Sequence, residues 1–202
     1  MPPSSSTSET AAPGDPRVVA LIGSPRASGN TADLVDVAID ELAGRGVSCE
    51  RVFLSDRNVL PCEGHEDCAD LALCPVGDDT CELLDLVYAA DGLILASPVY
   101  YENVSAQMKA FIDRNCFNNT HDVWLRARSV GLIAVAESTG LDETIDALRR
   151  YVALSSKTAL TPLTASGFAY RSGEALVNAA LVRAVRELAA TMALELGLPR
   201  SV

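Results

Sequence analysis

The sequence predicts an α/β fold in which a parallel sheet is covered on both faces by helices. Short apolar runs alternate with longer stretches whose apolar residues recur at helical spacing. The first run, residues 17–23 (RVVALIG), is apolar almost throughout, which is typical of a strand buried on both faces. Because strands that alternate with helices are joined by right-handed crossovers, the sheet is expected to be parallel.

Five runs are predicted to be strands: residues 17–23, 47–54, 92–97, 129–136 and 158–164. The second run is less apolar than the others and is expected near an edge of the sheet. The fifth contains Pro162, which has no amide hydrogen to donate, so an edge position is expected there too.

The helices between these strands are predicted from their capping residues. Asn30 or Thr31 is expected to cap the first helix and Ser105 the third. Asp79, followed three residues later by Glu82, resembles a capping box at the start of the second helix. Apolar residues at helical spacing follow residue 140, and a last helix is expected from about Gly173 to Leu196.

Length and composition predict one domain behind a short tail. The chain has 202 residues, enough for a sizeable core. Residues 1–16 are rich in Pro, Ser and Thr and are predicted to be a disordered tail, which leaves residues 17–202 as the folded domain.

The charge and the apolar runs exclude several classes of function. A formal net charge of −11 argues against binding to nucleic acid or to an anionic membrane surface. No apolar run reaches about 18 residues, so no transmembrane helix is expected. The first residues lack the basic and apolar regions of a secretory signal, and the six cysteines are then expected to be reduced thiols in the cytoplasm.

The loop after the first strand, GSPRASGNT (residues 23–31), contains a dense set of donors for a phosphate group. It has three hydroxyls, one guanidinium and one amide, and it opens a helix whose N-terminal amides are free. It matches neither the glycine pattern of a dinucleotide fold nor a Walker loop. A phosphate site is therefore predicted; a plain turn with a helix cap is the alternative.

This loop and the segment ASPVYYENVSAQMKAFIDR (residues 96–114) together resemble the flavodoxin-like NAD(P)H-dependent FMN reductases and their iron–sulfur flavoprotein relatives. The resemblance covers nearly all of the chain after the tail. It implies a three-layer α/β/α fold with a five-stranded parallel sheet in the order 2-1-3-4-5, FMN at the strand ends, and a homodimer or homotetramer. It also implies that the FMN phosphate is bound by Ser24, Arg26, Ser28, Asn30 and Thr31.

The resemblance further implies that two more loops hold the flavin ring. After the third strand, the apolar side chains of Pro98, Val99, Tyr100 and Tyr101 would contact the ring, and the backbone amides from Tyr101 through Asn103 to Val104 would reach its polar edge. The alternative role of the two tyrosines is packing or a subunit interface. Many relatives have glycine where this chain has Glu102.

The loop after the fourth strand is the third expected contact. Glu137, Ser138, Thr139 and Gly140 match the family in position rather than in a tight motif. A helix cap by Ser138 or Thr139 is the alternative.

The reaction implied by the resemblance needs no catalytic side chain, because the flavin would carry the chemistry. NAD(P)H would donate a hydride to FMN, and the electrons would then pass to a quinone, an azo or nitro compound, a flavin or another small acceptor. The alternative is a flavodoxin-type or iron–sulfur flavoprotein electron carrier that does not itself oxidise NAD(P)H.

The stretch CEGHEDCADLALC (residues 62–74) raises a separate question about metals. Iron–sulfur relatives carry four cysteines in this frame, whereas this chain has Cys62, His65, Cys68 and Cys74. A cluster, a zinc site and thiol redox chemistry are the functional alternatives. We favour a loop that kept its frame without a cluster and covers the flavin or a subunit interface.

Polar residues on the predicted helix after Ser105 are given a structural role. Lys109, Asp113 and Arg114 are expected on a solvated or salt-bridged face. His121 and Asp122 are expected in a surface loop, with a substrate-edge pair as the alternative.

Overall fold

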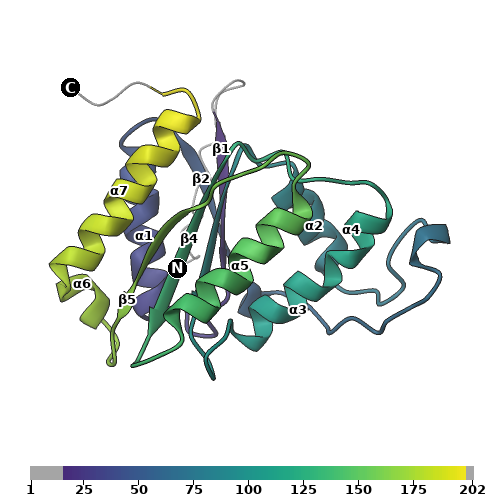
Figure 1. Cartoon of the computed structure of the whole chain (residues 1–202), viewed down its shortest axis with the longest axis horizontal. Helices are drawn as coiled ribbons and strands as arrows, with labels where there is room; N and C mark the ends of the chain where they lie inside the picture. The colour runs from purple at the N-terminus through teal and green to yellow at the C-terminus, as the bar shows by residue number, and fades with distance from the viewer. Residues whose placement is uncertain (1–15, 199–202) are drawn as a thin grey trace, which may run out of the picture.

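A five-stranded parallel sheet in the order β2-β1-β3-β4-β5 forms the centre of the computed structural model, which describes residues 16–198 (Figure 1). Its strands are β1 (Arg17–Ile22), β2 (Ser48–Phe53), β3 (Gly92–Pro98), β4 (Ser129–Ala136) and β5 (Leu163–Phe168). The predicted tail, residues 1–16, lies outside the described residues except for Pro16.

Helices cover both faces of this sheet and give the three layers that were predicted (Figure 1). One face packs against α1 (Asn30–Ala43) and α7 (Ala179–Glu195), next to the short α6 (Glu174–Val177). The other face packs against α2 (Thr80–Tyr88), α3 (Ala106–Arg114) and α5 (Leu141–Ser155). The short α4 (Cys116–Thr120) follows α3, and two 3₁₀ turns span Leu54–Asp56 and Cys68–Asp70.

Strand β1 shows how the sequence builds two cores with one strand. Val19 and Leu21 point to the side of α2, α3 and α5, whereas Val18, Ala20 and Ile22 point to the side of α1 and α7. All five side chains have no exposed surface. Burial of each larger apolar side chain stabilises the fold by about 1.5–3 kcal/mol, so an uninterrupted apolar run is favoured at this central position.

The structure confirms the parallel sheet, its order and the edge positions of the second and fifth strands. The predicted span of the fifth strand is wrong, because β5 begins at Leu163, just after Pro162, and ends at Phe168. The segment LTASGF has a weak apolar pattern, partly because position 167 is a glycine and has no side chain. A Cβ at this position would lie 2.9 Å from Cδ2 of Leu181. Because α7 packs closely on β5, glycine is favoured at position 167. The same glycine weakens the apolar pattern by which a strand is recognised in the sequence.

Two of the predicted helix boundaries also differ. The last helix is interrupted at Asn178, whose Oδ1 accepts from the amide of Leu181 at 3.2 Å and caps α7. The N-cap of α1 is Gly29 rather than Asn30 or Thr31.

At the start of α2, the Asp79 carboxylate makes no capping bond. It accepts instead from the amide of Asn58 at 2.7 Å, so the predicted capping box is wrong. Ser105 caps α3 as predicted, because its hydroxyl accepts from the amide of Met108 at 3.2 Å.

The sheet order places a crevice where β1 and β3 lie side by side. The chain winds away from these two strands in opposite directions, so their carboxyl ends are not covered by a crossover. Ser105 also donates to the carbonyl of Gly23 at 2.6 Å and so ties the loop after β1 to the start of α3. Among the helices in residues 16–198, none combines the length and apolar character that a membrane span needs.

Candidate flavin site at the carboxyl ends of the strands

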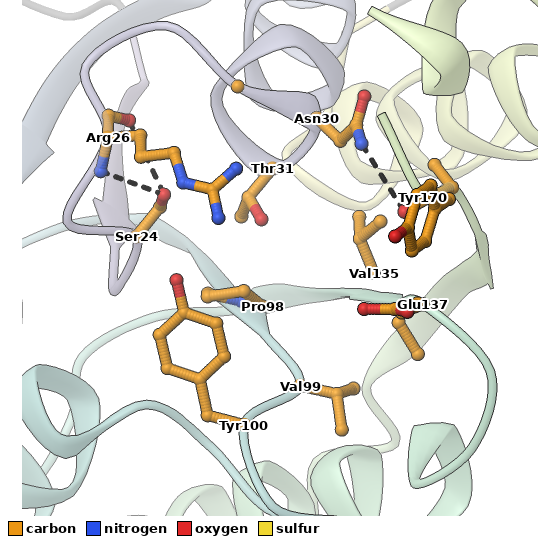
Figure 2. Close-up of a pocket in the computed structure, with 13 residues that line it drawn as sticks. Ser24, Arg26, Asn30, Thr31, Pro98, Val99, Tyr100, Val135, Glu137 and Tyr170 are labelled. Atoms are coloured by element: carbon orange, nitrogen blue, oxygen red, sulfur yellow. Dashed lines mark hydrogen bonds between the residues drawn. The ribbon is translucent and has the colours of Figure 1, made fainter. Parts of the chain in front are cut away.

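A cavity of about 150 Å³ lies at the carboxyl ends of β1, β3 and β4 (Figure 2). Seven of the predicted cofactor-binding residues line it: Ser24, Arg26, Asn30, Thr31, Pro98, Val99 and Tyr100. These residues come from two segments of the chain that are far apart in sequence. The fold therefore brings the two predicted loops to one place.

The wall from the β1 loop presents hydroxyls and a guanidinium. Ser24 and Thr31 are 5% and 3% exposed, and Figure 2 shows them beside the side chain of Arg26. The Ser24 hydroxyl accepts from the amide of Arg26 at 3.2 Å, which fixes the turn. Gly23 is needed just before this turn, because a Cβ there would lie 2.8 Å from the Ser105 hydroxyl.

The N-terminus of α1 opens onto the same wall. The first backbone bond into this helix from its N-cap runs from the amide of Asp33 to the carbonyl of Gly29 at 2.9 Å. The amides that precede Asp33 in the first turn have no partner inside the helix, and their aligned dipoles favour a negative charge. This end of the cavity therefore suits a phosphate.

Asn30 lines the cavity but its amide group has partners in the protein. Its Nδ2 donates to the carbonyls of Ala169 at 3.4 Å and Arg171 at 2.9 Å, and its Oδ1 accepts from the amide of Ala175 at 3.2 Å. Its side chain thus joins α1 to the segment after β5. Ser28 is exposed and does not line the cavity.

The opposite wall, from the β3 loop, is apolar and aromatic. Pro98, Val99 and Tyr100 face the Arg26 side across the cavity (Figure 2). The amide of Val99 donates to the carbonyl of Val135 at 2.8 Å, which extends the pairing of β3 with β4 past the end of β3. A flat ring placed here would have a rigid surface to lie against.

A two-residue turn follows this wall. Tyr100 and Asn103 pair with each other, with amide–carbonyl distances of 2.9 and 3.2 Å. The two residues between them, Tyr101 and Glu102, have φ angles of 53° and 58°. Positive φ at both central positions is the signature of a type I′ turn, for which Asn and Gly are the favoured residues.

This turn changes which amides can reach a ligand. The amide of Asn103 is bonded within the turn, and the amide of Val104 donates to the Asn103 side chain at 2.8 Å. Val104 itself is buried in the core. Of the four predicted amides, those of Tyr101 and Glu102 remain without a partner in residues 16–198.

A second cavity, of about 470 Å³, borders the first and shares Val99 and Glu137 with it. Its other lining residues are Tyr101, Glu102, Ser138 and Thr139. Ser138 and Thr139 are exposed, and neither caps α5. The N-cap is Gly140, so the alternative role of Ser138 or Thr139 as a helix cap is wrong.

Gly140 supports this region without lining either cavity. Its φ is +84°, and a Cβ there would lie 2.6 Å from the Cα of Glu102 and 2.7 Å from Cγ1 of Val99. A larger residue would displace the turn between the two cavities.

Two lining residues were missed because the fifth strand was misplaced. Ala169 and Tyr170 follow the end of β5 and line the first cavity. The amide of Ala169 donates to the carbonyl of Ala136 at 2.9 Å, which brings this segment alongside the end of β4. The carboxyl ends of parallel strands lie on the same side of the sheet. Had β5 been placed correctly, this rule would have predicted that Ala169 and Tyr170 lie at the cavity.

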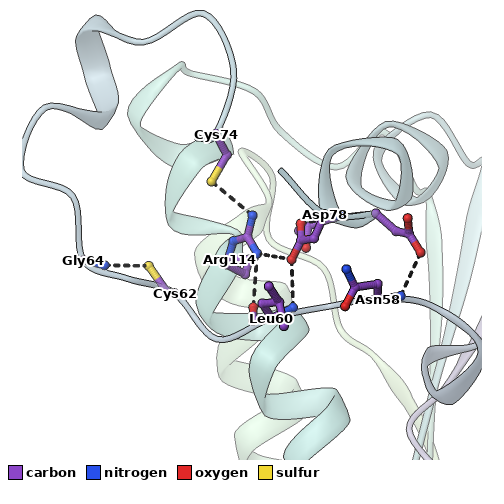
Figure 3. A network of polar contacts seen from close by, with 9 residues as sticks. Asn58, Leu60, Cys62, Gly64, Cys74, Asp78 and Arg114 are labelled. Atoms are coloured by element: carbon purple, nitrogen blue, oxygen red, sulfur yellow. Dashed lines mark hydrogen bonds and ion pairs between the residues drawn. The ribbon is translucent and has the colours of Figure 1, made fainter. Parts of the chain in front are cut away.

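The cysteine loop, residues 54–79, joins β2 to α2 and is closed by a buried arginine (Figure 3). Arg114 donates from Nη1 to the carbonyl of Leu60 at 3.1 Å and to the carboxylate of Asp78 at 2.6 Å. Its Nη2 donates to Sγ of Cys74 at 3.1 Å. The side chains of Arg114 and Asp78 are 1% and 0% exposed, so this pair is salt-bridged as expected but is not on a surface.

The carboxylate of Asp78 is stabilised by this network. Burial by itself would raise its pKa, but hydrogen bonds from Arg114, Leu60 and Thr80 lower the pKa to about 2. The charged form is therefore the one that holds the loop.

The four candidate metal ligands do not form a metal site here. Nε2 of His65 lies 3.5 Å from the carboxylate of Glu63, and Sγ of Cys74 accepts from Arg114. Within residues 16–198, no three Cys, His, Asp or Glu side chains are placed to share a metal ion. In this structure the fourth sulfur is held by a hydrogen bond from Arg114, and the four candidates are not gathered into a ligand set.

Cys62 and Cys68 are each tied to the local backbone. The amide of Gly64 donates to the sulfur of Cys62 at 3.4 Å, and the Cys68 thiol donates to the carbonyl of His65 at 3.3 Å. Burial, followed by the neighbouring thiols, raises the pKa of Cys68. A raised pKa lowers the thiolate fraction of Cys68.

The remaining polar residues have partners away from the cavities. Lys109 pairs with Asp113 on the surface of α3, as predicted. His121 bonds to backbone carbonyls, and the Asp122 carboxylate accepts from Trp124 and Lys157, so these two do not form a substrate pair.

Comparisons with known proteins agree with this geometry. The model of a family described as NADPH-dependent FMN reductase matches residues 16–170. An iron–sulfur flavoprotein of Methanocaldococcus jannaschii is 42% identical over 99 residues, which are 49% of this chain and 51% of that protein. One from Archaeoglobus fulgidus is 40% identical over 129 residues, which are 64% of this chain and 58% of that protein. The chain thus spans little more than half the length of these curated relatives.

A likeness to solved structures shows the same fold. The NAD(P)H:quinone oxidoreductase from Methanothermobacter marburgensis superposes with a TM-score of 0.64 at 16% identity, over 87% of this chain and 96% of that one. The family match includes the β1 loop, the β3 loop, the β4 loop and the end of β5, which together form the two cavities. The chain belongs to the NADPH-dependent FMN reductase family.

Proposed function

We propose that the protein is an FMN-dependent oxidoreductase that takes a hydride from NAD(P)H and reduces a small acceptor. The acceptor classes that we consider are quinones, azo and nitro compounds, and flavins. The observation that carries this proposal is the meeting of a phosphate-type wall and an aromatic wall at the carboxyl ends of β1 and β3. Family membership supports FMN as the cofactor and NAD(P)H as the co-substrate.

The β1 loop would bind the phosphate of FMN. Ser24 and Thr31 supply hydroxyl donors, Arg26 supplies a positive charge, and the start of α1 supplies amides. Helix amides and hydroxyls can satisfy a phosphate dianion with only one full counter-charge nearby. Ser28 is not part of this proposed set, and Asn30 would act through the position of the α1 terminus.

The β3 loop would hold the flavin ring. Pro98, Val99 and Tyr100 provide an apolar face, and the amides of Tyr101 and Glu102 are the donors left for the polar edge of the ring. When bound, FMN accepts a hydride and passes electrons on, while the protein supplies its orientation and electrostatic surroundings. Ser138 and Thr139 border the space beyond the ring, where a donor or an acceptor would enter.

A spectroscopic and kinetic experiment tests this proposal. Purified protein reconstituted with FMN should show the visible bands of a bound flavin and should oxidise NADH or NADPH when menadione is supplied. Oxidation is followed as loss of the nicotinamide absorbance. A protein that binds FMN but oxidises neither nucleotide would be a flavodoxin-type carrier, and one that binds no FMN would contradict the proposal altogether.

The state of association is a further part of the proposal. Exposed apolar side chains gather after β5 and on α6, where Tyr170, Leu176 and Val177 are 65%, 47% and 82% exposed. Such a group supports a homodimer or homotetramer that covers this surface. Light scattering after gel filtration would test it, and a monomer at micromolar concentration would contradict it. We propose a cytoplasmic location, because six cysteines in a chain of this size are expected to be reduced thiols.

A further inference from the structure

The second cavity has an unbalanced charge. Glu102 and Glu137 both line it, and no Lys or Arg does so among the residues that the structure describes. Neither carboxylate has an ion pair or a hydrogen bond to a side chain or amide in residues 16–198. The cation at this site, Arg26, lines the other cavity, where the phosphate would bind.

The backbone turn places Glu102 at this cavity; no hydrogen bond or ion pair of its side chain in residues 16–198 does so. The residue is the second central residue of the type I′ turn, with a φ of 58°. This conformation costs a residue other than glycine about 1–2 kcal/mol. The turn is closed by the Tyr100–Asn103 pairing and rests on Gly140, so the surrounding structure imposes it. Glycine would avoid this cost, but it would remove the carboxylate.

From this arrangement we propose that Glu102 determines acceptor specificity by charge. Together with Glu137, it favours neutral and cationic electron acceptors over anionic ones at the second cavity. The inference rests on the proposed function, because it concerns the molecule that receives electrons at that site. It adds the chemical class of the preferred acceptor, which neither the fold nor the family gives.

The size of the effect follows from Coulomb's law. An acceptor with three charges that approaches within about 8 Å of one carboxylate in water changes its encounter rate roughly three- to tenfold at about 10 mM salt. At about 0.5 M salt, screening should reduce the change to less than about twofold. The charge effect is therefore separable from changes in shape, which do not depend on salt.

Two outer-sphere oxidants of opposite charge provide the kinetic test. FMN-loaded protein is reduced with stoichiometric dithionite and mixed in a stopped-flow instrument with hexaammineruthenium(III), a trication, or with ferricyanide, a trianion. Each metal ion takes one electron, so two ions reoxidise one fully reduced flavin and its protons pass to the solvent. NAD(P)H is absent, so the result does not depend on whether the protein oxidises it.

Three variants separate charge from turn shape and from net charge. Glu102→Gln removes the charge and keeps the side-chain volume, whereas Glu102→Gly also relieves the turn. Glu187→Gln makes the same change in net charge at an exposed position on α7, away from the cavities. Glu102→Gln should speed reoxidation by ferricyanide and slow reoxidation by the ruthenium complex by roughly three- to tenfold at about 10 mM salt. Glu187→Gln should change neither rate by as much as about twofold.

A binding measurement without electron transfer completes the test. Isotope-labelled protein, with or without FMN, is titrated with hexacyanochromate(III) and with tris(ethylenediamine)chromium(III), two redox-inert paramagnetic ions of opposite charge. The cation should broaden the amide signals of Ser138 and Thr139 more than the anion does, and Glu102→Gln should reduce this difference.

The outcomes are decisive in either direction. The inference would be overturned if wild type and Glu102→Gln were reoxidised at equal rates by both oxidants. It would also be overturned if the cationic and anionic chromium complexes broadened the amide signals of Ser138 and Thr139 equally. A change seen with Glu102→Gly and not with Glu102→Gln would assign the effect to the turn instead and would also overturn it. Failure to bind FMN would contradict the proposed function, while the chromium titration on the flavin-free protein would still decide the charge preference.

Discussion

The β1 loop and the cysteine loop both leave the carboxyl ends of neighbouring strands, β1 and β2. Their polar groups differ in whether they face a cavity or are paired inside the protein. In the β1 loop, Ser24, Arg26 and Thr31 line a cavity, and α1 presents unpaired amides beside them. In the cysteine loop, Asp78 forms a buried ion pair with Arg114 of α3. The comparison teaches that polar residue types of the same kind can line a cavity in one loop and be satisfied by buried partners in another.

The largest effect expected from this contrast is on the closure of the cysteine loop. Arg114→Met should lower the free energy of unfolding by about 3–5 kcal/mol, because it leaves the buried Asp78 carboxylate without its partner. Urea denaturation followed by circular dichroism measures this change. Lys109→Met, which breaks an exposed pair on the same helix, is the matched control and should cost less than about 1 kcal/mol. Similar small losses in both variants would show that Arg114 is not the residue that holds the loop.

A second effect of the same network depends on pH. The pKa of Asp78 in the folded protein is about 2, below its ordinary value of 3.8. The stability that its charge contributes is thus present above about pH 4 and is lost as the pH falls towards 2. The free energy of unfolding of Asp78→Asn should depend less steeply on pH in this range than that of wild type. Asp70→Asn, at an exposed residue of the same loop, should keep the wild-type slope.

The β1 loop should show a smaller effect on stability and a direct effect on cofactor binding. Ser24→Ala and Thr31→Val should each weaken FMN binding roughly tenfold, because each removes a hydroxyl donor to a charged phosphate. Quenching of flavin fluorescence on titration of the flavin-free protein gives the dissociation constant. Ser28→Ala is the matched control in the same loop and should bind FMN as wild type does. Equal weakening by all three would place the phosphate elsewhere along the loop.

The features that the sequence predicted are formed by residues that are neighbours in the chain. The features that it missed depend on contacts between residues that are far apart in the chain. The β1 loop was recognisable because its donors are neighbours in the chain and precede a helix. Arg114 and Cys74 lie 40 positions apart, so their contact was not visible in the spacing of the cysteines. Ser28 was included because it shares the loop, although it is exposed and does not line the cavity. Tyr170 was missed because Gly167 masked the strand that leads to it.

The smallest effect separates local strain from function at the turn between the two cavities. Glu102→Gly should raise the free energy of unfolding by about 1 kcal/mol, because glycine adopts the φ of 58° without steric cost. Part of this gain is offset by the greater freedom of glycine in the unfolded chain. Glu102→Gln keeps the strain and should unfold like wild type, and thermal unfolding of the two variants side by side measures the difference. If Glu102→Gly were less stable than wild type, the Glu102 side chain would contribute more to stability than its backbone conformation costs. The turn would then resemble the Arg114 network, which stabilises the fold, more than it resembles the open β1 loop.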